Sequence, residues 1–494
     1  MALSKEVYKE FEDVVGAENI CDDPAIMPAY FSTDFAVVIL PKNTAEVQAI
    51  VKLCNRHKLK FRPISTGWTG AFTGGVVLLD LRRMNHIIEI NEKNMYAVVE
   101  PYVISAQLQA ELMKRGLNFC IKGAGTNTSA LLRGHGHMDQ TTSGDDRNHL
   151  AIEWVTPEGD IVRTGALGSS NEWCCGDGPG PSLRSILTSA VPPGASPGVF
   201  TKAAMKLYHW PGPSGFPVEG MSPHYFLSEI PPRLMVRYFS FPSVEKMWEA
   251  ELKIGESEIS YELMGFNASM VAANITTSNE EEEETFKQLS KEVQGPGFLV
   301  IIAGNFAEDF EYKKRVLEQI IKETSGKSLE TVEDPKIEGI LLCHCIRISA
   351  SIRETFRNGG MFKSIPIMGQ RDLNIKWAMG AGKAKEPLIK KGLIVDDGGA
   401  FFGWGVEQGH LGKTEIFCKF DPQNLEAWNA VMEWRKEQSV RAFNEHYFSY
   451  TLAGQTADEA DAEAANLCNY HLWWRKLRKV IDPNDATPEG GALV

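Results

Sequence analysis

The stretch that most constrains the fold of this 494-residue chain is a glycine- and threonine-rich loop between two strand-like runs. The runs lie around residues 59–64 and 76–81, and the loop between them holds Gly67, Gly70, Gly74 and Gly75. Such a loop turns tightly and brings several backbone N–H groups close to one anion. It contains no Lys and matches neither the P-loop nor the Rossmann spacing, so amides and hydroxyls would hold a phosphate. The alternative is that the loop is a plain turn without a ligand. The sequence on either side of the loop distinguishes the two interpretations.

The composition of the chain excludes several classes of ligand and binding partner. The net charge of −13 argues against an extended nucleic-acid surface. Nine cysteines without any C-x-x-C argue against a metal site or an iron–sulfur cluster held by this chain, and against a disulfide framework. The N-terminus lacks an apolar signal region, and no apolar run reaches membrane-spanning length. We therefore expect no metal, no nucleic acid, no transmembrane segment and a cytoplasmic location.

The first part of the chain predicts a small α+β unit. A helix is expected over residues 4–15, a strand over 34–40, and a second helix that ends at Arg56 with Thr44 as its N-cap. The strand–loop–strand stretch follows. A strand over 97–100 and a helix over 105–115 complete the unit.

The next part opens with a long Gly- and Thr-rich stretch that has little periodicity, and such a stretch is usually functional. Pro157-Glu158-Gly159 predicts a hairpin between strands at 151–156 and 160–163. From about residue 214 helices and strands alternate, with strands expected at 233–241 and 339–348. The acidic run 280–284 reads as a solvated helix start, and a last helix is expected over 460–480.

Several motifs in a fixed order resemble one family. PKNTAEVQAIV, RPISTGWTGAFTGG, VVLLDLRRMNHI, SALLRGHGHMDQTTSGDDR, EWVTPEGDIVRTGALG, SPGVFTKAAMKLY and RKLRKVIDPND are similar to the vanillyl-alcohol oxidase/para-cresol methylhydroxylase (PCMH-type) flavoproteins. The resemblance implies an α+β fold with a two-lobed FAD-binding domain at 1–213, its lobes at roughly 35–120 and 121–213. It also implies a cap over the substrate at 214–435 and a C-terminal segment, 436–494, that completes the site.

The resemblance implies which residues hold FAD. The loop would wrap the diphosphate with backbone N–H groups, further residues would line the flavin, and the last pair would lie on the adenosine side. In chain order these residues are Pro63, Ser65, Thr66, Gly67, Trp68, Thr69, Gly70, Ser129, Gly134, Gly136, Ser143, Gly144, Gly198 and Val199.

The resemblance also implies catalytic residues. Asp145 falls where the aromatic-alcohol members carry an acid near flavin N5; a loop cap or a partner of Arg147 is the alternative, and Asp146 is next in register. His410 would face the substrate cavity as a base, although a lone His is often structural. His446 and Tyr447 fall near the family's substrate-binding Tyr. The expected pocket residues are Trp68, Arg347, Glu407 and Phe448.

Departures from the family pattern limit the substrate. Trp68 and Phe448 stand where phenol oxidisers carry a Tyr and an Arg, so a para-alkylphenolate is disfavoured. The metal-binding H-x-G-D-G-N-x-H stretch of the glycolate and D-lactate branch is missing. Cys343-His344-Cys345 lies in an alternating run that predicts a core strand, with both thiols on one face and His344 on the other.

The leading interpretation is an FAD-dependent dehydrogenase acting on an alcohol or hydroxy acid, with non-covalent FAD. The alternatives are a methylhydroxylase of the para-alkylphenol type or an O₂-using oxidase, and, in another class, a flavin-bearing electron-transfer or scaffold subunit. Because the chain has no redox-centre motif, its electrons would pass to O₂, a soluble carrier, or an iron–sulfur, cytochrome or electron-transfer flavoprotein partner. A homo- or hetero-oligomer is expected.

Overall fold

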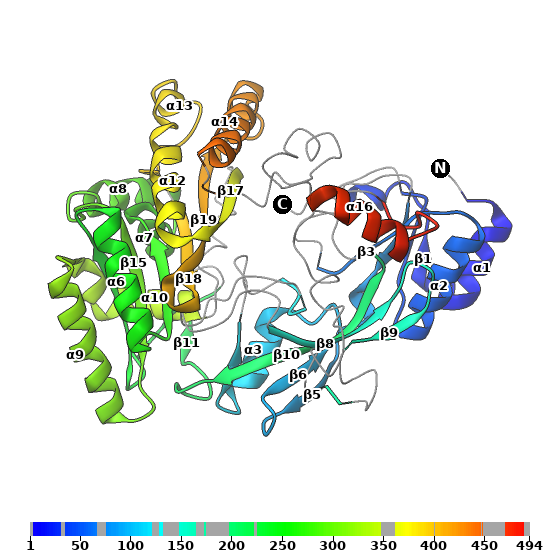
Figure 1. Ribbon diagram of the computed structural model, residues 1–494, viewed down its shortest axis with the longest axis horizontal. Helices are drawn as coiled ribbons and strands as arrows, with labels where there is room; N and C mark the ends of the chain where they lie inside the picture. The colour runs from blue at the N-terminus through cyan, green and yellow to red at the C-terminus, as the bar shows by residue number, and fades with distance from the viewer. Residues whose placement is uncertain are drawn as a thin grey trace.

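The computed structural model describes most of the chain. The described residues are 3–30, 35–66, 76–120, 128–131, 148–164, 172–173, 197–221, 225–346, 361–399, 401–445, 447 and 470–488. Figure 1 shows two small sheets with their helices on one side and a larger helix-covered sheet on the other. The two small sheets are called the first and second lobes below, and the larger unit is called the cap.

The first lobe is a four-stranded sheet with the strand order β1-β2-β4-β3. Strands β2, β4 and β3 run parallel, and β1 pairs antiparallel with β2. Helices α1 and α2 pack on it, and their apolar positions, such as Phe11 and Val47, are fully buried. The bounds are α1 Lys5–Val15, β1 Ile20–Cys21, β2 Val37–Ile39, α2 Thr44–Arg56, β3 Phe61–Ile64 and β4 Val77–Asp80.

Local sequence explains these helix starts. Ser4 caps α1 by accepting a hydrogen bond from the N–H of Val7. For α2 the expected N-cap, Thr44, is wrong by one residue. Asn43 is the cap and accepts from the N–H of Glu46, while the Thr44 hydroxyl bonds to Glu153 of the second lobe instead.

The second lobe is an antiparallel sheet with the order β5-β6-β10-β8-β9, and β7 also pairs with β10. The predicted hairpin is confirmed, because Val155 of β8 pairs with Ile161 of β9. Helix α3 packs across the sheet through Leu108 and Leu112. The bounds are β5 Ile87–Asn91, β6 Tyr96–Val99, α3 Ser105–Met113, β7 Leu117–Phe119, β8 His149–Val155, β9 Ile161–Arg163 and β10 Val199–His209.

The cap is built on a seven-stranded sheet with the order β16-β13-β15-β14-β18-β19-β17. The strand bounds are β13 Leu234–Ser240, β14 Glu262–Phe266, β15 Gly297–Ala303, β16 Lys327–Ser328, β17 Met361–Gln370, β18 Phe401–Val406 and β19 Leu411–Phe420. The helix bounds are α6 Val244–Ser257, α7 Ala268–Ile275, α8 Asn279–Leu289, α9 Ala307–Glu323, α10 Pro335–Ile346, α12 Arg371–Lys383, α13 Glu386–Lys390 and α14 Leu425–Asn444. A two-residue ladder, β11 Val218–Glu219 with β12 Phe226–Leu227, precedes β13 in the chain.

The two faces of the cap sheet have different neighbours. On the outer face, residues such as Ile416 and Phe420 pack with α6, α9, α12 and α14. On the inner face, Phe402, Trp404 and Phe417 belong to a cluster that includes α7, α10 and the second-lobe residues Met113, Cys120 and Trp210. The inner face is therefore the one that continues into the second lobe.

Two expectations in the cap are corrected. Residues 339–346 do not form a strand; they are the end of helix α10, in which Leu341, Leu342, Cys343 and Cys345 are all buried. The acidic run does begin helix α8, capped by Ser278, as predicted. Glu282, however, points inward, where it is 3% exposed and pairs with Lys419 at 3.5 Å.

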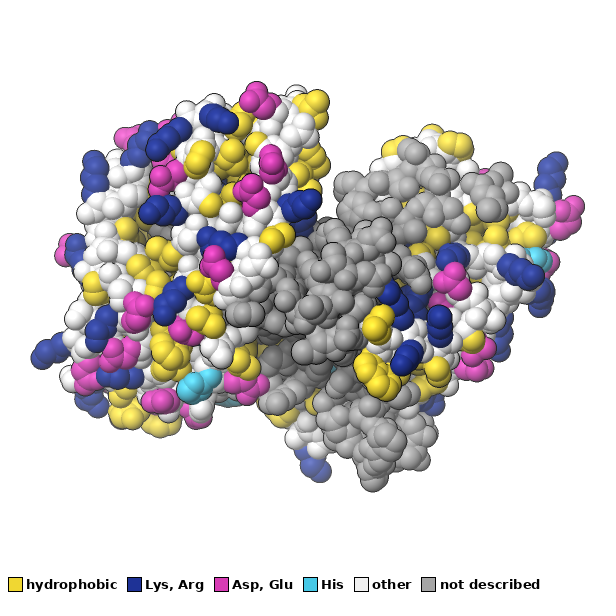
Figure 2. Space-filling model, turned by 45° about the horizontal axis from the view of Figure 1, so that its top comes forward, with side chains coloured by type: hydrophobic (Ala, Val, Ile, Leu, Met, Phe, Trp, Pro, Cys, Tyr) yellow, Lys and Arg dark blue, Asp and Glu magenta, His cyan; other side chains and the backbone are white. Residues whose placement is uncertain are grey.

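The described surface of the cap carries both signs of charge. Figure 2 shows Lys and Arg side chains interspersed with Asp and Glu over the cap in that view. Some of these charges pair along helices, as Lys287 does with Glu283 at 2.6 Å. Such exposed pairs contribute little to stability, so they mark a solvated surface.

Candidate functional site

The parallel strands of the first lobe end together at one edge, where ligands of parallel sheets usually bind. Pro63 is the third residue of β3, and Ser65 and Thr66 leave its carboxyl end directly. Asp80, the partner of Ile64 across the ladder, ends β4 at the same edge. Gly67, Trp68, Thr69 and Gly70 lie outside the described residues. Residues 65–76 connect two adjacent parallel strands, which is long enough for a loop that wraps a ligand.

Charge at this edge is already balanced. Asp80 is 1% exposed and accepts from the Tyr30 hydroxyl at 2.7 Å and from Arg82 Nε at 2.7 Å. Burial, and then the hydrogen bond to Asp80, raises the pKa of Tyr30. Tyr30 thus stays a neutral donor. Because Arg82 is bound to Asp80, an anion here would depend on backbone amides and on hydroxyls such as those of Ser65 and Thr66.

The other described residues that are expected to hold FAD are Ser129, Gly198 and Val199, and their backbone is fixed by nearby contacts. Ser129 donates to the carbonyl of Pro101 at 2.6 Å and accepts from the N–H of Leu131, so its side chain fixes the local backbone. Gly198 and Val199 open β10 beside the end of β8, since Val199 pairs with Val155. Gly134, Gly136, Ser143 and Gly144 lie outside the described residues.

Gly198 is required by its geometry. Its φ is +95°, and a Cβ there would lie 2.4 Å from the Val155 carbonyl oxygen and 2.5 Å from Trp154 Nε1. That indole N–H donates to the carbonyl of Pro197 at 2.8 Å, which ties residues 197–198 to β8. The backbone of Gly198 therefore packs directly against β8.

Gly198→Ala should therefore displace this backbone and destabilise the protein by about 1–3 kcal/mol, the cost of a strained φ/ψ position. We also expect weaker FAD binding. Denaturant titration and a flavin-binding titration measure the two effects. Gly215→Ala is the matched control, because Gly215 has an ordinary φ and open space around its Cβ. Equal behaviour of the two variants would contradict the requirement.

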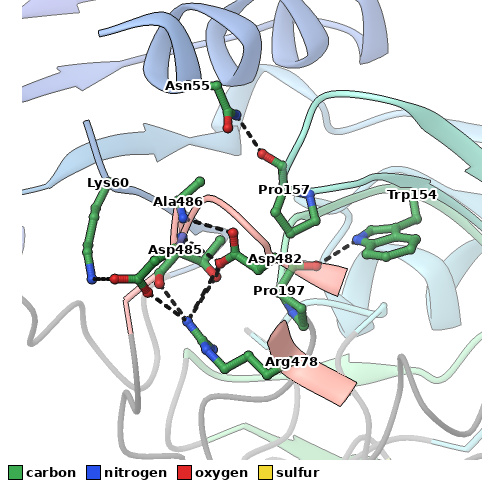
Figure 3. Close-up of polar contacts among 10 residues, drawn as sticks. Asn55, Lys60, Trp154, Pro157, Pro197, Arg478, Asp482, Asp485 and Ala486 are labelled. Carbon is green, nitrogen blue, oxygen red and sulfur yellow. Dashed lines mark hydrogen bonds and ion pairs between the residues drawn. The ribbon is translucent and has the colours of Figure 1, made fainter. Parts of the chain in front are cut away.

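The C-terminal segment binds at the other end of the first lobe, where β3 begins (Figure 3). After helix α16, Tyr470–Ile481, Asp482 accepts from the N–H groups of Ala486 and Thr487 at 2.8 and 2.9 Å. The carbonyl of Ala486 then accepts from the N–H of Phe61 at the start of β3. Lys60 pairs with Asp485 at 2.6 Å. The end of the chain thus extends the first lobe.

A buried tyrosine holds Asn148, which lies three residues after Asp145 in the sequence. Asp145 lies outside the described residues, but Asn148, which is 1% exposed, accepts from the Tyr208 hydroxyl at 2.6 Å. Burial, and then the neighbouring Cys120, raises the pKa of Tyr208. The hydroxyl therefore stays protonated and donates. This bond fixes the point at which the Asp145 segment rejoins β8.

A second polar chain joins the second lobe to the cap. Gln109 donates to Asn118 at 3.3 Å, and Asn118 donates to the Tyr261 hydroxyl at 2.8 Å. Gln109 also donates to the carbonyl of Ile346, the last residue of α10, at 2.8 Å. Arg347, the next residue, lies outside the described residues. The carboxyl end of α10 is therefore bonded directly to the second lobe.

The predicted cap residues lie beside the outer-face helices. Glu407 and Gln408 have φ of +50° and +60°, a strained turn between β18 and β19. Trp248 of α6 donates to the Gly409 carbonyl, and the N–H of Arg371 donates to the His410 carbonyl. The His410 side chain is exposed. Its role as a base stays a prediction.

Tyr447 follows α14 and packs partly buried against the outer-face cluster. Its N–H donates to the carbonyl of Ala442 at 2.8 Å, which fixes the backbone at this position. Its neighbours His446 and Phe448 lie outside the described residues. Substrate contacts by these three residues remain predictions.

Sequence reasoning missed a charged pair on the inner face. Lys413 of β19 is 8% exposed, and its ammonium lies 2.6 Å from Glu415 and 5.3 Å from the centre of the Trp404 ring. The available signal was the alternation of charged and apolar residues in KTEIFCKF. That pattern normally indicates a solvent-facing strand surface.

The Cys343-His344-Cys345 stretch is not assembled as a metal site. His344 Nε2 contacts the carbonyl of Tyr225 at 2.9 Å. Burial, and then Glu262, raises the pKa of the Cys345 thiol, which disfavours the thiolate that a metal needs. Among the described residues, no group of three or more His, Cys, Asp or Glu is arranged to hold a metal ion.

Comparison with known families and proteins gives a consistent result. Residues 35–165 match the FAD binding domain family. The chain is 28% identical over 36% of its length to 1'-carboxy-chondrochloren decarboxylase of Chondromyces crocatus. It is 32% identical over 33% of its length to glycolate oxidase subunit GlcD of Bacillus subtilis, and 25% identical over 54% to D-lactate dehydrogenase of Anaerostipes hadrus. These alignments span 37%, 38% and 58% of the respective relatives, less than two thirds of each.

Solved structures match along nearly the whole chain. A 4-ethylphenol oxidase from Gulosibacter chungangensis superposes with a TM-score of 0.72 at 18% identity, covering 98% of this chain and 97% of that one. A p-cresol methylhydroxylase superposes equally well, at 16% identity over 97% of this chain and 95% of the other. At these identities the likeness establishes the fold.

Proposed function

We propose that this chain, whose residues 35–165 match the FAD binding domain family, is an FAD-dependent oxidoreductase of the PCMH-type FAD-linked oxidase family. Its proposed reaction removes a hydride from the C–H bond of an alcohol or hydroxy acid. Residues 1–213 and 436–494 would hold FAD, and residues 214–435 would cover the substrate. The relatives named for glycolate and D-lactate oxidation support this substrate class.

The observation that carries the proposal is the combination of an FAD-binding domain with a cap whose inner face continues into the second lobe. The described residues fit the cofactor, because Ser65, Thr66 and the confined Gly198 backbone offer hydroxyls, amides and close approach. Bound FAD would supply the hydride acceptor, N5 of the flavin. The chain's own part is to hold the substrate, exclude water and take the hydroxyl proton. Asp145 would stabilise charge beside the flavin.

Anaerobic flavin bleaching tests the function directly. Purified protein loaded with FAD is mixed with a panel of primary alcohols, secondary alcohols, 2-hydroxy acids and para-alkylphenols. We expect the flavin absorbance to fall with an alcohol or hydroxy acid. If no compound bleaches a flavin that dithionite still reduces, the proposed dehydrogenase function is wrong.

Two other functions have some support. The 4-ethylphenol oxidase and p-cresol methylhydroxylase folds favour a phenol-oxidising enzyme of the methylhydroxylase or O₂-using type. Bleaching only by para-alkylphenols would select it. A flavin-bearing electron-transfer or scaffold subunit is the candidate of another class. It would be reduced by a partner protein and by none of the panel.

We predict that FAD is bound without a covalent link. Family members attach flavin through a His or Tyr of the cap or a His of the Gly loop, and residues 345–409 have no His, residues 313–446 no Tyr, and residues 63–75 neither. Acid precipitation should leave a colourless pellet and a yellow supernatant. An intact mass larger than the polypeptide by one FAD would refute this, with His410 as the first suspect.

A partner is proposed for the re-oxidation of the flavin. A non-covalent flavin favours an acceptor of modest potential, such as an iron–sulfur or flavoprotein subunit, and one relative is itself named as a subunit. We therefore propose a hetero-oligomer, with a homo-oligomer and a cytochrome acceptor as alternatives. Within the described ranges, no helix combines the length and the apolar character needed to span a membrane.

A further inference from the structure

Strand β19 carries buried charges on one of its faces. It lies between β18 and β17, so it is an interior strand of the cap sheet. Its outer face presents Thr414, Ile416 and Cys418, which pack toward the helices. Its inner face presents Lys413, Glu415, Phe417 and Lys419 by the two-residue alternation of a strand. Buried charges are costly unless they are paired, so each of them needs a reason.

Lys419 has a structural reason. It is 3% exposed and pairs with Glu282 at the start of helix α8, at 3.5 Å. The side chains of both residues are 4% exposed. This pair joins the sheet to α8 and has little access to solvent.

Lys413 and Glu415 differ from that pair in geometry and access. Their N–O distance is 2.6 Å, against 3.5 Å for Lys419 and Glu282, and both residues lie on β19 itself. The side chain of Glu415 is 20% exposed, against 10% for that of Lys413. Trp404, the ladder partner of Lys413 on β18, lies beneath the ammonium. The pair is therefore a donor and an acceptor side by side, on an apolar floor and with limited access.

Trp404 belongs to the inner face of the cap sheet, which continues into the second lobe. Trp404 contacts Phe402 at 5.2 Å between ring centres, and both belong to the cluster that contains Cys120 and Trp210 of the second lobe. Helices α6 and α12 lie on the other face. A substrate between the cap and the FAD-binding domain would therefore meet the inner face of the sheet.

We propose that Lys413 and Glu415 form the hydroxyl-binding site for the substrate, with Glu415 as the catalytic base. This inference rests on the proposed function and names the group that takes the proton. A hydroxyl needs an acceptor for its proton and a donor for its oxygen, and the two side chains supply both. During oxidation the O–H bond breaks and the proton moves to a Glu415 carboxylate oxygen. Bound FAD would accept the hydride from the C–H bond as the carbonyl forms, and Lys413 would stabilise negative charge on the substrate oxygen.

The test compares Glu415→Gln with Glu283→Gln. Glu283 is the matched control, since it also pairs with a lysine at 2.6 Å but on the exposed surface of α8. We expect Glu415→Gln to slow anaerobic flavin reduction at saturating substrate by about a hundredfold or more, the range for a general base. In the Glu415→Gln variant the acidic limb of the pH–rate profile should also disappear, because the group whose protonation causes that limb is gone. FAD content and substrate-induced shifts of the flavin spectrum should remain as in wild type, while the thermal midpoint should fall because Lys413 loses its carboxylate partner.

Lys413→Met should weaken substrate binding in the spectral titration by about tenfold or more, the scale of one hydrogen bond to a charged group. Lys413→Arg should restore part of it. If Glu415→Gln loses FAD or unfolds, the double variant Lys413→Met/Glu415→Gln leaves no unpaired buried charge, and it should fold but reduce its flavin slowly.

The outcomes separate the two proposals. Wild-type flavin that no substrate bleaches overturns the proposed function itself. If substrate bleaches the wild-type flavin, the proposed function stands. If the flavin of Glu415→Gln or of the double variant is then reduced at a rate within about threefold of the wild-type rate, the role of Glu415 alone is overturned. An unchanged acidic limb in a slowed, folded variant also overturns it, and the exposed His410 would then be the base to examine.

Discussion

Replacing Arg371 with methionine should lower the free energy of unfolding by about 3–5 kcal/mol, the usual cost of breaking a buried ion pair. Arg371 begins α12 and is 0% exposed. Its Nε and Nη2 donate to the two oxygens of Glu251, both at 2.8 Å, and Nη1 donates to the Thr414 hydroxyl at 2.8 Å. The variant leaves the Glu251 carboxylate buried without this partner, and this accounts for the large loss.

Urea unfolding of wild type and variant measures the change. Arg56→Met is the matched control, because Arg56 pairs with Glu10 at 2.9 Å on the exposed surface, and it should cost less than about 1 kcal/mol. Removing both charges with Arg371→Met/Glu251→Met should recover much of the loss. A loss no larger than that of Arg56→Met would show that the pair contributes no more than a surface one.

Asp145→Asn should slow flavin reduction by about a hundredfold or more, the scale of one lost electrostatic stabiliser in an active site. The substitution keeps the size of the side chain and removes its charge. Tyr208 and Asn148 hold the end of this segment in both forms, so the fold should be unaffected.

Stopped-flow reduction under anaerobic conditions gives the rate, and the flavin spectrum before mixing checks that the site is intact. Asp146→Asn is the informative companion, since it is the neighbouring residue of the same type. A slow Asp146→Asn variant with a normal Asp145→Asn variant would move the role by one residue. Two normal variants would remove both carboxylates from the mechanism.

The sequence was most informative where local signals and burial agree. In α2, Val47, Ile50, Val51 and Cys54 recur at the helical period, and all four are 0% exposed in the structure. The turn residues 157–159 correctly predicted the hairpin between β8 and β9. The N-cap moved by one residue because Asn43 and Thr44 are both good caps, and Thr44 has a competing partner in Glu153.

Helix α10 was misread because its environment removes the usual signal. A helix buried on every side has no polar stripe, so its apolar run looks the same as that of a buried strand. His344 and Glu338 are also buried, at 5% and 7% exposed, within this helix. The preceding Pro335, a favourable first helical residue, was the local clue.

The charged pair on β19 was missed for the opposite reason. Its polar–apolar alternation was visible, but alternation alone cannot tell which face of a strand meets solvent. The answer depends on the second lobe, whose Trp210 and Cys120 approach from more than 190 residues earlier in the chain. Long-range packing of this kind leaves no local trace in the sequence.

The closure of the first lobe by the C-terminal segment has a consequence for synthesis on the ribosome. Asn484 bonds to Asn55 and Asp485 to Lys60, across sequence separations of 429 and 425 residues. At translation rates of about 5–20 residues per second, roughly 20–90 s pass between the emergence of α2 and that of its last partners. During that interval the start of β3 lacks its neighbour at Ala486. The lobe that emerges first is thus completed last, after the whole cap has left the ribosome.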